Sequence, residues 1–197
     1  MTVTADDLDT AVSAMVGALR PGVDRDWAAV PAAAVETDCW HAGEHIGDVL
    51  VSYAGQLVAR PSGRYVKFVA SADQDCTAAE ILEFASAGGR ILAATVRTSP
   101  AELRAYHPTG MADPAGFAGM GCVEALVHGH DIAAGLGLPF DAPRDVCRRV
   151  LARMFPAVTA GDDDPWAVLL WATGRADLPG RAPVGPDWHW QGAPMPS

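Results

Sequence analysis

The spacing of apolar residues along the chain predicts a series of helices separated by breaks that contain proline or glycine. In the second of these helices the apolar face includes Ile46, Leu50, Tyr53 and Leu57. Six helical stretches are expected, at about residues 5–19, 39–59, 77–97, 114–135, 143–154 and 165–172.

Local signals mark where two of these helices begin. Thr77 and Glu80 have the spacing of a capping box, in which the threonine accepts a first-turn N–H and the glutamate reaches back. Asp113-Pro114 supplies an N-cap followed by a first-turn proline. Both starts are therefore predicted from side-chain chemistry as well as from periodicity.

One segment, Tyr65–Val69, alternates like a strand. A single short extended segment cannot form a sheet, so we expect a connector packed on the helices. The sequence contains no internal repeat and no domain linker. It predicts one all-α domain over residues 1–197, a four-helix bundle with additional short C-terminal helices.

Three polar residues fall on one stripe of the fourth helix. Glu124, His128 and Asp131 are spaced i, i+4 and i+7, which places them within about 60° of one another. Their neighbours on that side are apolar, and a buried carboxylate and imidazole are costly unless they are paired or bind a metal. We interpret this stripe as half of a metal site.

The second helix carries a matching stripe formed by His41, His45, Asp48 and Ser52. Helical bundles build metal sites by projecting side chains inward from facing helices. A catalytic zinc ion needs three protein ligands and one open position. One ligand from the second helix, together with Glu124 and His128, would meet that requirement.

Each of these residues also has an ordinary structural interpretation. His41 lies near a helix start and is expected to be an exposed histidine. His45 and Asp48 could hydrogen-bond to each other on the surface, and Glu124 with His128 could be a satisfied core pair. Asp131 could cap a helix or pair with an arginine.

Other residues carry no comparable signal. His130 lies on the far side of its helix and is interpreted as structural or exposed, and His107 lies in a loop. Cys122 lies about 160° from Glu124 around the helix, which disfavours a nucleophile–base pair.

The composition of the chain limits the classes of partner that we expect it to bind. The net charge of -10 argues against nucleic acid, which requires a clustered basic surface. Four cysteines without a CxxC pair indicate reduced thiols, and no apolar run is long enough to cross a bilayer. The N-terminus lacks the features of a signal peptide. We therefore expect a cytoplasmic protein without membrane or nucleic-acid partners.

Several motifs together resemble a known family. Cys39-Trp40 opens the second helix, the fourth contains Glu124-xxx-His128-Gly-x-Asp131, and residues 188–194 read Trp-His-Trp-Gln-Gly-Ala-Pro. These elements resemble the N-terminal-domain family of mycothiol-dependent maleylpyruvate isomerase, in the DinB-like superfamily of metal-binding four-helix bundles. The resemblance covers most of the chain. It implies a divalent metal, usually zinc, held by a second-helix histidine with Glu124 and His128.

The chain departs from that family in two respects. Asp48 stands where the family has its second-helix histidine, and the nearest histidine is His45, one turn earlier. The ligand is thus Asp48, or His45 after a local shift, or the metal is held weakly. A site with two carboxylates would favour a harder ion such as manganese. The family's additional C-terminal domain is also missing, so maleylpyruvate isomerisation itself is not expected.

The function expected from the resemblance is that of a metal-dependent thiol transferase or thiol-assisted isomerase. Zinc is the first choice of metal, with manganese or nickel as alternatives. A mycothiol-type thiol and a small electrophilic substrate would be its partners, with Asp131 as a catalytic carboxylate that orients a ligand or the thiol. The alternative is a non-catalytic bundle with a lapsed metal site that binds a small ligand or a partner. A purely structural, homodimeric bundle is a third and weaker hypothesis.

Overall fold

The computed structural model describes residues 2–185 and 188–194 of the chain, and the prediction of an all-α bundle is confirmed. Within these residues there is no β-strand, only two isolated β-bridges. The elements are α1 (Ala5–Leu19), η1 (Arg20–Gly22), η2 (Trp27–Ala29), α2 (Cys39–Ala59), α3 (Ala78–Thr98), α4 (Pro114–Val123), η3 (Glu124–His128), α5 (Gly129–Gly135), α6 (Arg144–Met154) and α7 (Pro165–Ala172).

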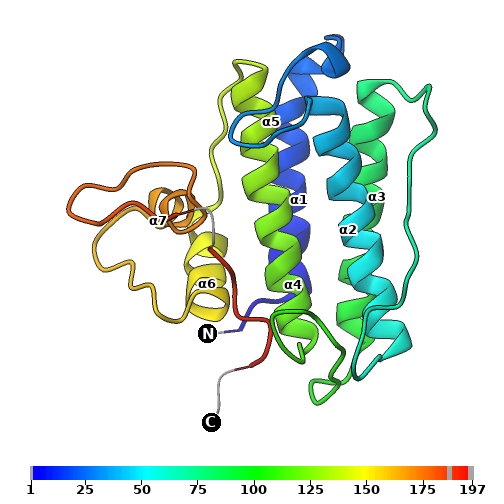
Figure 1. Cartoon of the computed structure of the whole chain (residues 1–197), viewed down its shortest axis with the longest axis vertical. Coiled ribbons are helices and arrows are strands. Elements are labelled where there is room, and N and C mark those ends of the chain that lie inside the picture. Colours follow the sequence, from blue (N-terminus) through cyan, green and yellow to red (C-terminus); the bar gives the residue numbers. More distant parts are fainter. Residues whose placement is uncertain (1, 186–187, 195–197) are drawn as a thin grey trace.

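Four long helical rods lie side by side, namely α1, α2, α3 and the continuous run α4–η3–α5 (Figure 1). Helix α2 packs on α3, while α1 contacts both α3 and α4. Helices α6 and α7 lie on one side of the bundle, where α6 contacts α4 and α1 and α7 packs on α6, and an extended segment runs along the opposite side. Fully buried side chains from all four rods fill the centre: Leu8, Met15, Ile46, Leu50, Leu57, Ile81, Leu92, Met120 and Leu126.

Polar side chains define the starts of the rods. Thr77 and Glu80 form the predicted capping box at α3, and Asp113 caps α4 by accepting the Gly116 N–H at 2.7 Å. These caps satisfy first-turn N–H groups that have no partner within the helix. The predicted starts of these two helices are therefore correct.

The fourth rod differs from the prediction in its middle. The sequence predicts one regular α-helix over residues 114–135, whereas Glu124–His128 form a π-helical turn, η3. A π turn bonds i to i+5, and such turns are found often at functional sites. No glycine or proline lies within this turn to signal it.

Glycines let α2 and α3 approach closely. A Cβ atom on Gly43 would lie 2.6 Å from Ile81 and one on Gly47 would lie 2.3 Å from Phe84. Gly88 of α3 lies against the carbonyl oxygen of Gly47, where a Cβ would be only 2.9 Å away. A larger residue at Gly43 or Gly47 would displace the side chain of Ile81 or Phe84, and one at Gly88 would press on the backbone of α2 itself.

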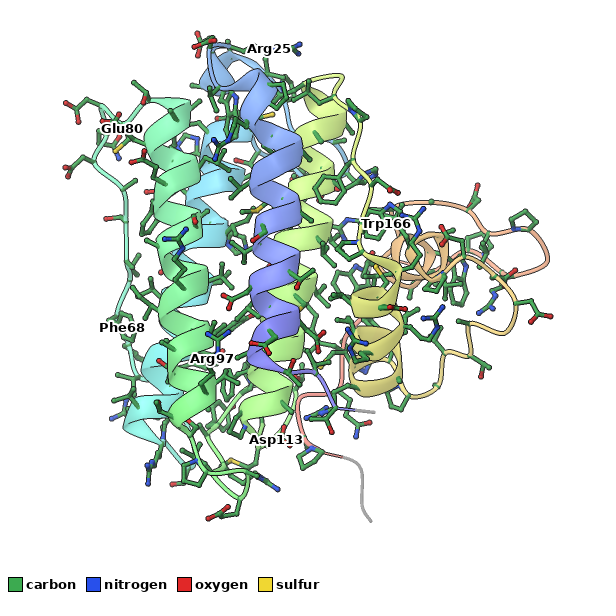
Figure 2. All side chains as sticks on the ribbon, turned by 180° about the vertical axis from the view of Figure 1, so that it is seen from behind. Arg25, Phe68, Glu80, Arg97, Asp113 and Trp166 are labelled. Carbon is green, nitrogen blue, oxygen red and sulfur yellow. The ribbon has the colours of Figure 1, made fainter. Side chains whose placement is uncertain are left out.

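The segment that joins α2 to α3, residues 60–77, is called the connector below. It is extended but does not form a strand, as expected for Tyr65–Val69. Side chains of α2 bind its backbone in three places: Gln56 accepts the Val66 N–H at 2.9 Å, Asp48 the Ala70 N–H at 2.9 Å, and Glu44 the Ala72 N–H at 3.2 Å. Phe68, labelled in Figure 2, packs over Gly55 of α2.

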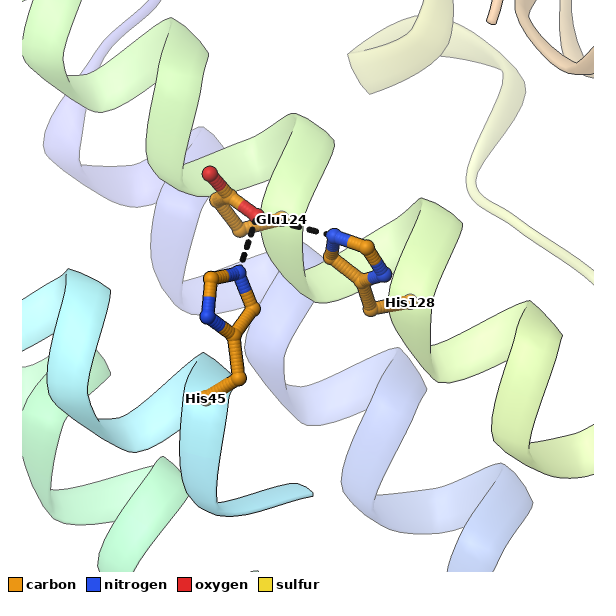
Figure 3. Close-up of side chains that lie close together, drawn as sticks. All are labelled: His45, Glu124 and His128. Atoms are coloured by element: carbon orange, nitrogen blue, oxygen red, sulfur yellow. Dashed lines mark ion pairs between the residues drawn. The ribbon is translucent and has the colours of Figure 1, made fainter. Parts of the chain in front are cut away.

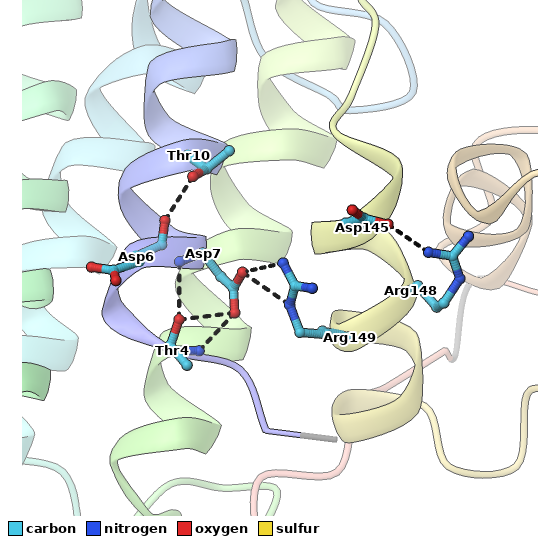
Figure 4. Close-up of polar contacts among 7 residues, drawn as sticks. All are labelled: Thr4, Asp6, Asp7, Thr10, Asp145, Arg148 and Arg149. Atoms are coloured by element: carbon cyan, nitrogen blue, oxygen red, sulfur yellow. Dashed lines mark hydrogen bonds and ion pairs between the residues drawn. The ribbon is translucent and has the colours of Figure 1, made fainter.

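Residues 138–185 and 188–194 form a C-terminal unit, whose contacts with the bundle include Trp166 and three arginines. Trp166 lies at the junction of α7 with the bundle, 5.6 Å from the ring of His130 (Figure 2). Three ion pairs dock the unit: Arg149 with Asp7 at 2.6 Å, Arg153 with Asp113 at 2.7 Å, and Arg175 with Asp131 at 3.0 Å. Figure 4 shows the first of these, in which Asp7 also closes the capping box of α1 with Thr4.

The length and hydropathy of the helices decide whether any of them could cross a membrane. Among the described residues, no helix combines the length and the apolar character that a membrane span requires.

Candidate metal centre

Three metal-ligating side chains from two rods meet at one point (Figure 3). His45 extends from α2, and Glu124 and His128 extend from η3. Glu124 Oε2 lies 3.6 Å from His45 Nε2 and 3.2 Å from His128 Nε2. One donor atom from each of the three residues lies within 4.8 Å of the other two.

Solvent reaches the three residues unequally. The Glu124 side chain is 7% exposed and that of His128 is 21% exposed, whereas that of His45 is 49% exposed. The carboxylate therefore forms the buried floor of the cluster, and the His45 side opens to solvent.

The two oxygens of Glu124 have different partners. Oε1 accepts a hydrogen bond from the hydroxyl of Tyr53 at 2.8 Å, while Oε2 faces the two imidazoles. Burial alone would raise the pKa of Glu124, but the hydrogen bonds to His128 and His45 outweigh it and hold that pKa well below its usual value. Burial, followed by the nearby charge of Glu124, raises the pKa of Tyr53 well above its usual value, so its hydroxyl stays a donor.

His128 is held from both ends. Its Nε2 faces Glu124, and its Nδ1 lies 3.3 Å from Oδ2 of the fully buried Asp131. Burial opposes protonation of His128, but hydrogen bonds to Asp131 and Glu124 raise its pKa to about 9. In the metal-free protein at neutral pH, His128 therefore carries a proton between two carboxylates.

The group formed by His45, Glu124 and His128 could hold a metal ion. Ligands bound at 2.0–2.2 Å in a tetrahedron are about 3.3–3.5 Å apart, close to the two measured separations of 3.2 and 3.6 Å. Two imidazoles and one carboxylate are a donor set found in catalytic zinc sites, which keep a fourth position open. If a metal binds, the contacts of Tyr53 with Glu124 and of Asp131 with His128 would fix the orientation of its ligands, as neighbours of bound metals commonly do.

The structure brings together four of the five residues proposed from the sequence. Glu124, His128 and Asp131 lie on one side of the rod, as predicted, and His45 faces them from α2. Asp48 lies elsewhere, because its carboxylate accepts the Ala70 N–H of the connector. His45 and Asp48 thus have separate partners rather than each other.

The remaining histidines have structural surroundings. His41 is 57% exposed and pairs with the helix cap Asp38 at 2.8 Å, the ordinary role expected for it. The ring of His130 packs against those of Phe140 and Trp166.

Sequence reasoning missed three neighbours of the site: Tyr53, His107 and Arg175. Tyr53 lies on the apolar face of α2, and its need for a buried hydrogen-bond partner was the signal that could have identified it. His107 lies 6.0 Å from the Tyr53 ring, accepts the Thr109 N–H through Nδ1, and has a pKa lowered to about 4 by burial. Arg175 follows a short helix and had no periodicity to mark it.

Comparisons with known proteins identify no relative: no protein-family model, no curated protein and no solved structure matches this chain. The assignment of the candidate metal centre therefore rests on the geometry of its residues alone.

Proposed function

We propose that this protein is a metal-dependent enzyme that binds zinc through His45, Glu124 and His128. It would use the bound metal to activate a low-molecular-weight thiol, for transfer to a small electrophile or for thiol-assisted isomerisation. The observation that carries the proposal is the convergence of two imidazoles on one oxygen of a buried carboxylate.

The donor set favours zinc over the alternatives. Had Asp48 been the second-helix ligand, two carboxylates would have favoured a harder ion such as manganese. Because Asp48 is occupied by the connector, the donors that remain are two nitrogens and one oxygen. Nickel can use the same donors and is an outcome that metal analysis would distinguish.

The chain's own residues would hold and orient the ligands. Tyr53 binds Oε1 of Glu124 and leaves Oε2 for the metal. Asp131 lies at Nδ1 of His128 and would keep a proton on that nitrogen, so that Nε2 would be free to bind the metal beside Glu124. Asp131 thus acts through His128 as a positioning residue. Bound zinc would lower the pKa of a coordinated thiol, which makes a thiolate available at neutral pH.

The thiol would come from solution. Burial raises the pKa of Cys39 to about 11 and that of Cys147 to about 12, and it also raises that of Cys122, so all three are poor nucleophiles. Cys76 is partly exposed but is not one of the three donors. The family resemblance supplies the thiol class, a mycothiol-type molecule.

One of the two grounds for the alternative of a non-catalytic bundle was that Asp48 replaces the second-helix histidine. The position of His45 beside Glu124 argues against that premise.

Elemental analysis of protein purified without chelator or a nickel column tests the metal. We expect near-stoichiometric zinc in the wild type, loss of zinc in Glu124→Gln and His128→Ala, and retention in the control His41→Ala. Wild-type protein that stays metal-free after loading with zinc, manganese or nickel would overturn the proposal.

A second measurement tests the thiol. Cobalt-substituted protein should develop a sulfur-to-cobalt absorption band when mycothiol is added. A cobalt protein whose spectrum does not respond to thiols would retain the metal site and contradict the thiol chemistry.

A further inference from the structure

We infer that Arg175 is a positioning residue of the metal centre, through which docking of the C-terminal unit and metal binding are coupled. The inference rests on the proposed metal function and extends it to a residue outside the bundle. It begins from the contacts of Asp131.

Asp131 is fully buried and lies between two cationic or donor groups. Arg175 donates from Nη2 to Oδ2 at 3.0 Å and from Nε to Oδ1 at 3.4 Å. His128 Nδ1 lies 3.3 Å from the same Oδ2. The guanidinium therefore spans both oxygens and fixes the plane of the carboxylate that faces His128.

Arg175 is itself fixed by the C-terminal unit. Its Nη1 donates to the carbonyl oxygen of Thr173 at 2.7 Å, and its guanidinium lies 5.6 Å from the ring centre of Trp188. The side chain is only 8% exposed. A chain of contacts thus runs from this unit through Arg175 and Asp131 to His128 and Glu124.

The other two docking arginines provide an internal comparison. Arg153 is equally buried and binds Asp113 and the carbonyl oxygen of Gly192, while Arg149 binds Asp7. Asp113 caps α4 and Asp7 belongs to the capping box of α1, and the hydrogen bonds of these two carboxylates join them to Gly116, Thr4 and the arginines rather than to His45, Glu124 or His128. Only the Arg175 pair reaches the metal centre.

The test compares zinc affinity in Arg175→Met and Arg153→Met, measured by competition with a chelator of known affinity. Both variants lose one buried ion pair to the C-terminal unit, but we expect only Arg175→Met to bind zinc about 10–100-fold more weakly. Arg175→Lys keeps the charge without the two-point contact, so it covers the case in which the Met variant does not fold. Zinc affinity in a folded Arg175 variant within twofold of wild type, or an equal loss in Arg153→Met, would overturn the inference.

A double-mutant cycle tests whether Arg175 acts through Asp131. If it does, Arg175→Met combined with Asp131→Asn should bind zinc no more weakly than Asp131→Asn alone. If the losses of zinc affinity in the two single variants add fully in the double variant, Arg175 does not act through Asp131. Wild-type protein that binds no metal would overturn the proposed function as well, so the two failures are distinguishable.

If docking of the C-terminal unit strengthens zinc binding, zinc binding must strengthen that docking by the same factor, because linkage is reciprocal. The amides of Gly174 and Arg175 are hydrogen-bonded to the end of α7. Adding zinc should slow their hydrogen exchange in wild type and not in Asp131→Asn. If zinc slows hydrogen exchange in the wild type only within η3 and α2, the C-terminal unit is not coupled to the metal centre.

Discussion

The polar side chains of α2 have two kinds of partner. Toward η3, His45 and Tyr53 both reach one carboxylate, that of Glu124. Toward the connector, Glu44, Asp48 and Gln56 each bind a different backbone amide. Residues of similar chemistry therefore converge on one point in the first set and are spread along an extended segment in the second.

The two sets of side chains differ in the partner that completes their hydrogen bonding. The connector brings N–H donors, so its acceptors on α2 are matched without any ligand. At the candidate metal centre two imidazoles face one oxygen of the buried Glu124 carboxylate, and their N–H groups, rather than a backbone amide, stabilise its negative charge. In the metal-free protein the proton on His128 fills that role, and we expect a metal ion to replace it.

The largest effect should separate His45 from Asp48. His45→Ala removes a proposed ligand and should weaken zinc binding by more than about 100-fold, because the loss of residues that only support ligands already weakens binding by about 10–100-fold. Asp48→Asn keeps an acceptor for the connector and should bind zinc within twofold of wild type. Chelator competition on both variants checks this, and the reverse pattern would assign the second-helix ligand to Asp48.

The next effect is the pH dependence of metal binding. Because the pKa of His128 is raised to about 9 in the metal-free protein, zinc must displace a proton below that pH. Zinc affinity should therefore rise about tenfold per pH unit from pH 7 to 9 and level off above. Competition titrations across this range measure the slope, and an affinity independent of pH would show that His128 is not a ligand.

A smaller effect is expected for the support of Glu124. Tyr53→Phe removes the hydrogen bond to Oε1 and keeps the ring, so zinc binding should weaken by about tenfold. Tyr106→Phe is the matched control, since the Tyr106 ring packs against Tyr65 rather than against Glu124. Equal affinities in the two variants would mean that the Tyr53 contact does not orient the ligand.

The smallest effect on the metal is expected for the α2 side chains that bind the connector. Gln56→Ala removes both contacts to Val66 and should lower the free energy of unfolding by about 1–2 kcal/mol. Zinc affinity should stay within twofold of wild type, because the hydrogen bonds of Gln56 go to Val66 and not to His45, Glu124 or His128. Urea denaturation and chelator competition on one preparation measure both, and a larger loss of zinc affinity would show that the connector and the metal centre are coupled.

Much of this organisation could be predicted from the sequence. Caps and breaking residues gave helix bounds close to those observed, because they act within one turn of the chain. Glu124, His128 and Asp131 also share a side as expected, since their spacing is local.

The choice between His45 and Asp48 could not be predicted. The two positions lie about 60° apart on α2, so either could face η3, and the packing of α2 on α3 decides which one does. Arg175 reaches the site only because the C-terminal unit docks on the bundle. Both outcomes depend on tertiary contacts that periodicity does not encode.

The glycines of α2 have a consequence for the order of folding. Gly43, Gly47 and Gly55 each cost about 1 kcal/mol of intrinsic helix stability relative to alanine, and the fourth rod also contains several glycines. The two rods that carry the ligands are therefore poor helices in isolation and become ordered when neighbouring rods pack against them. We expect the metal centre to be among the last parts of the molecule to form and the first to loosen on heating.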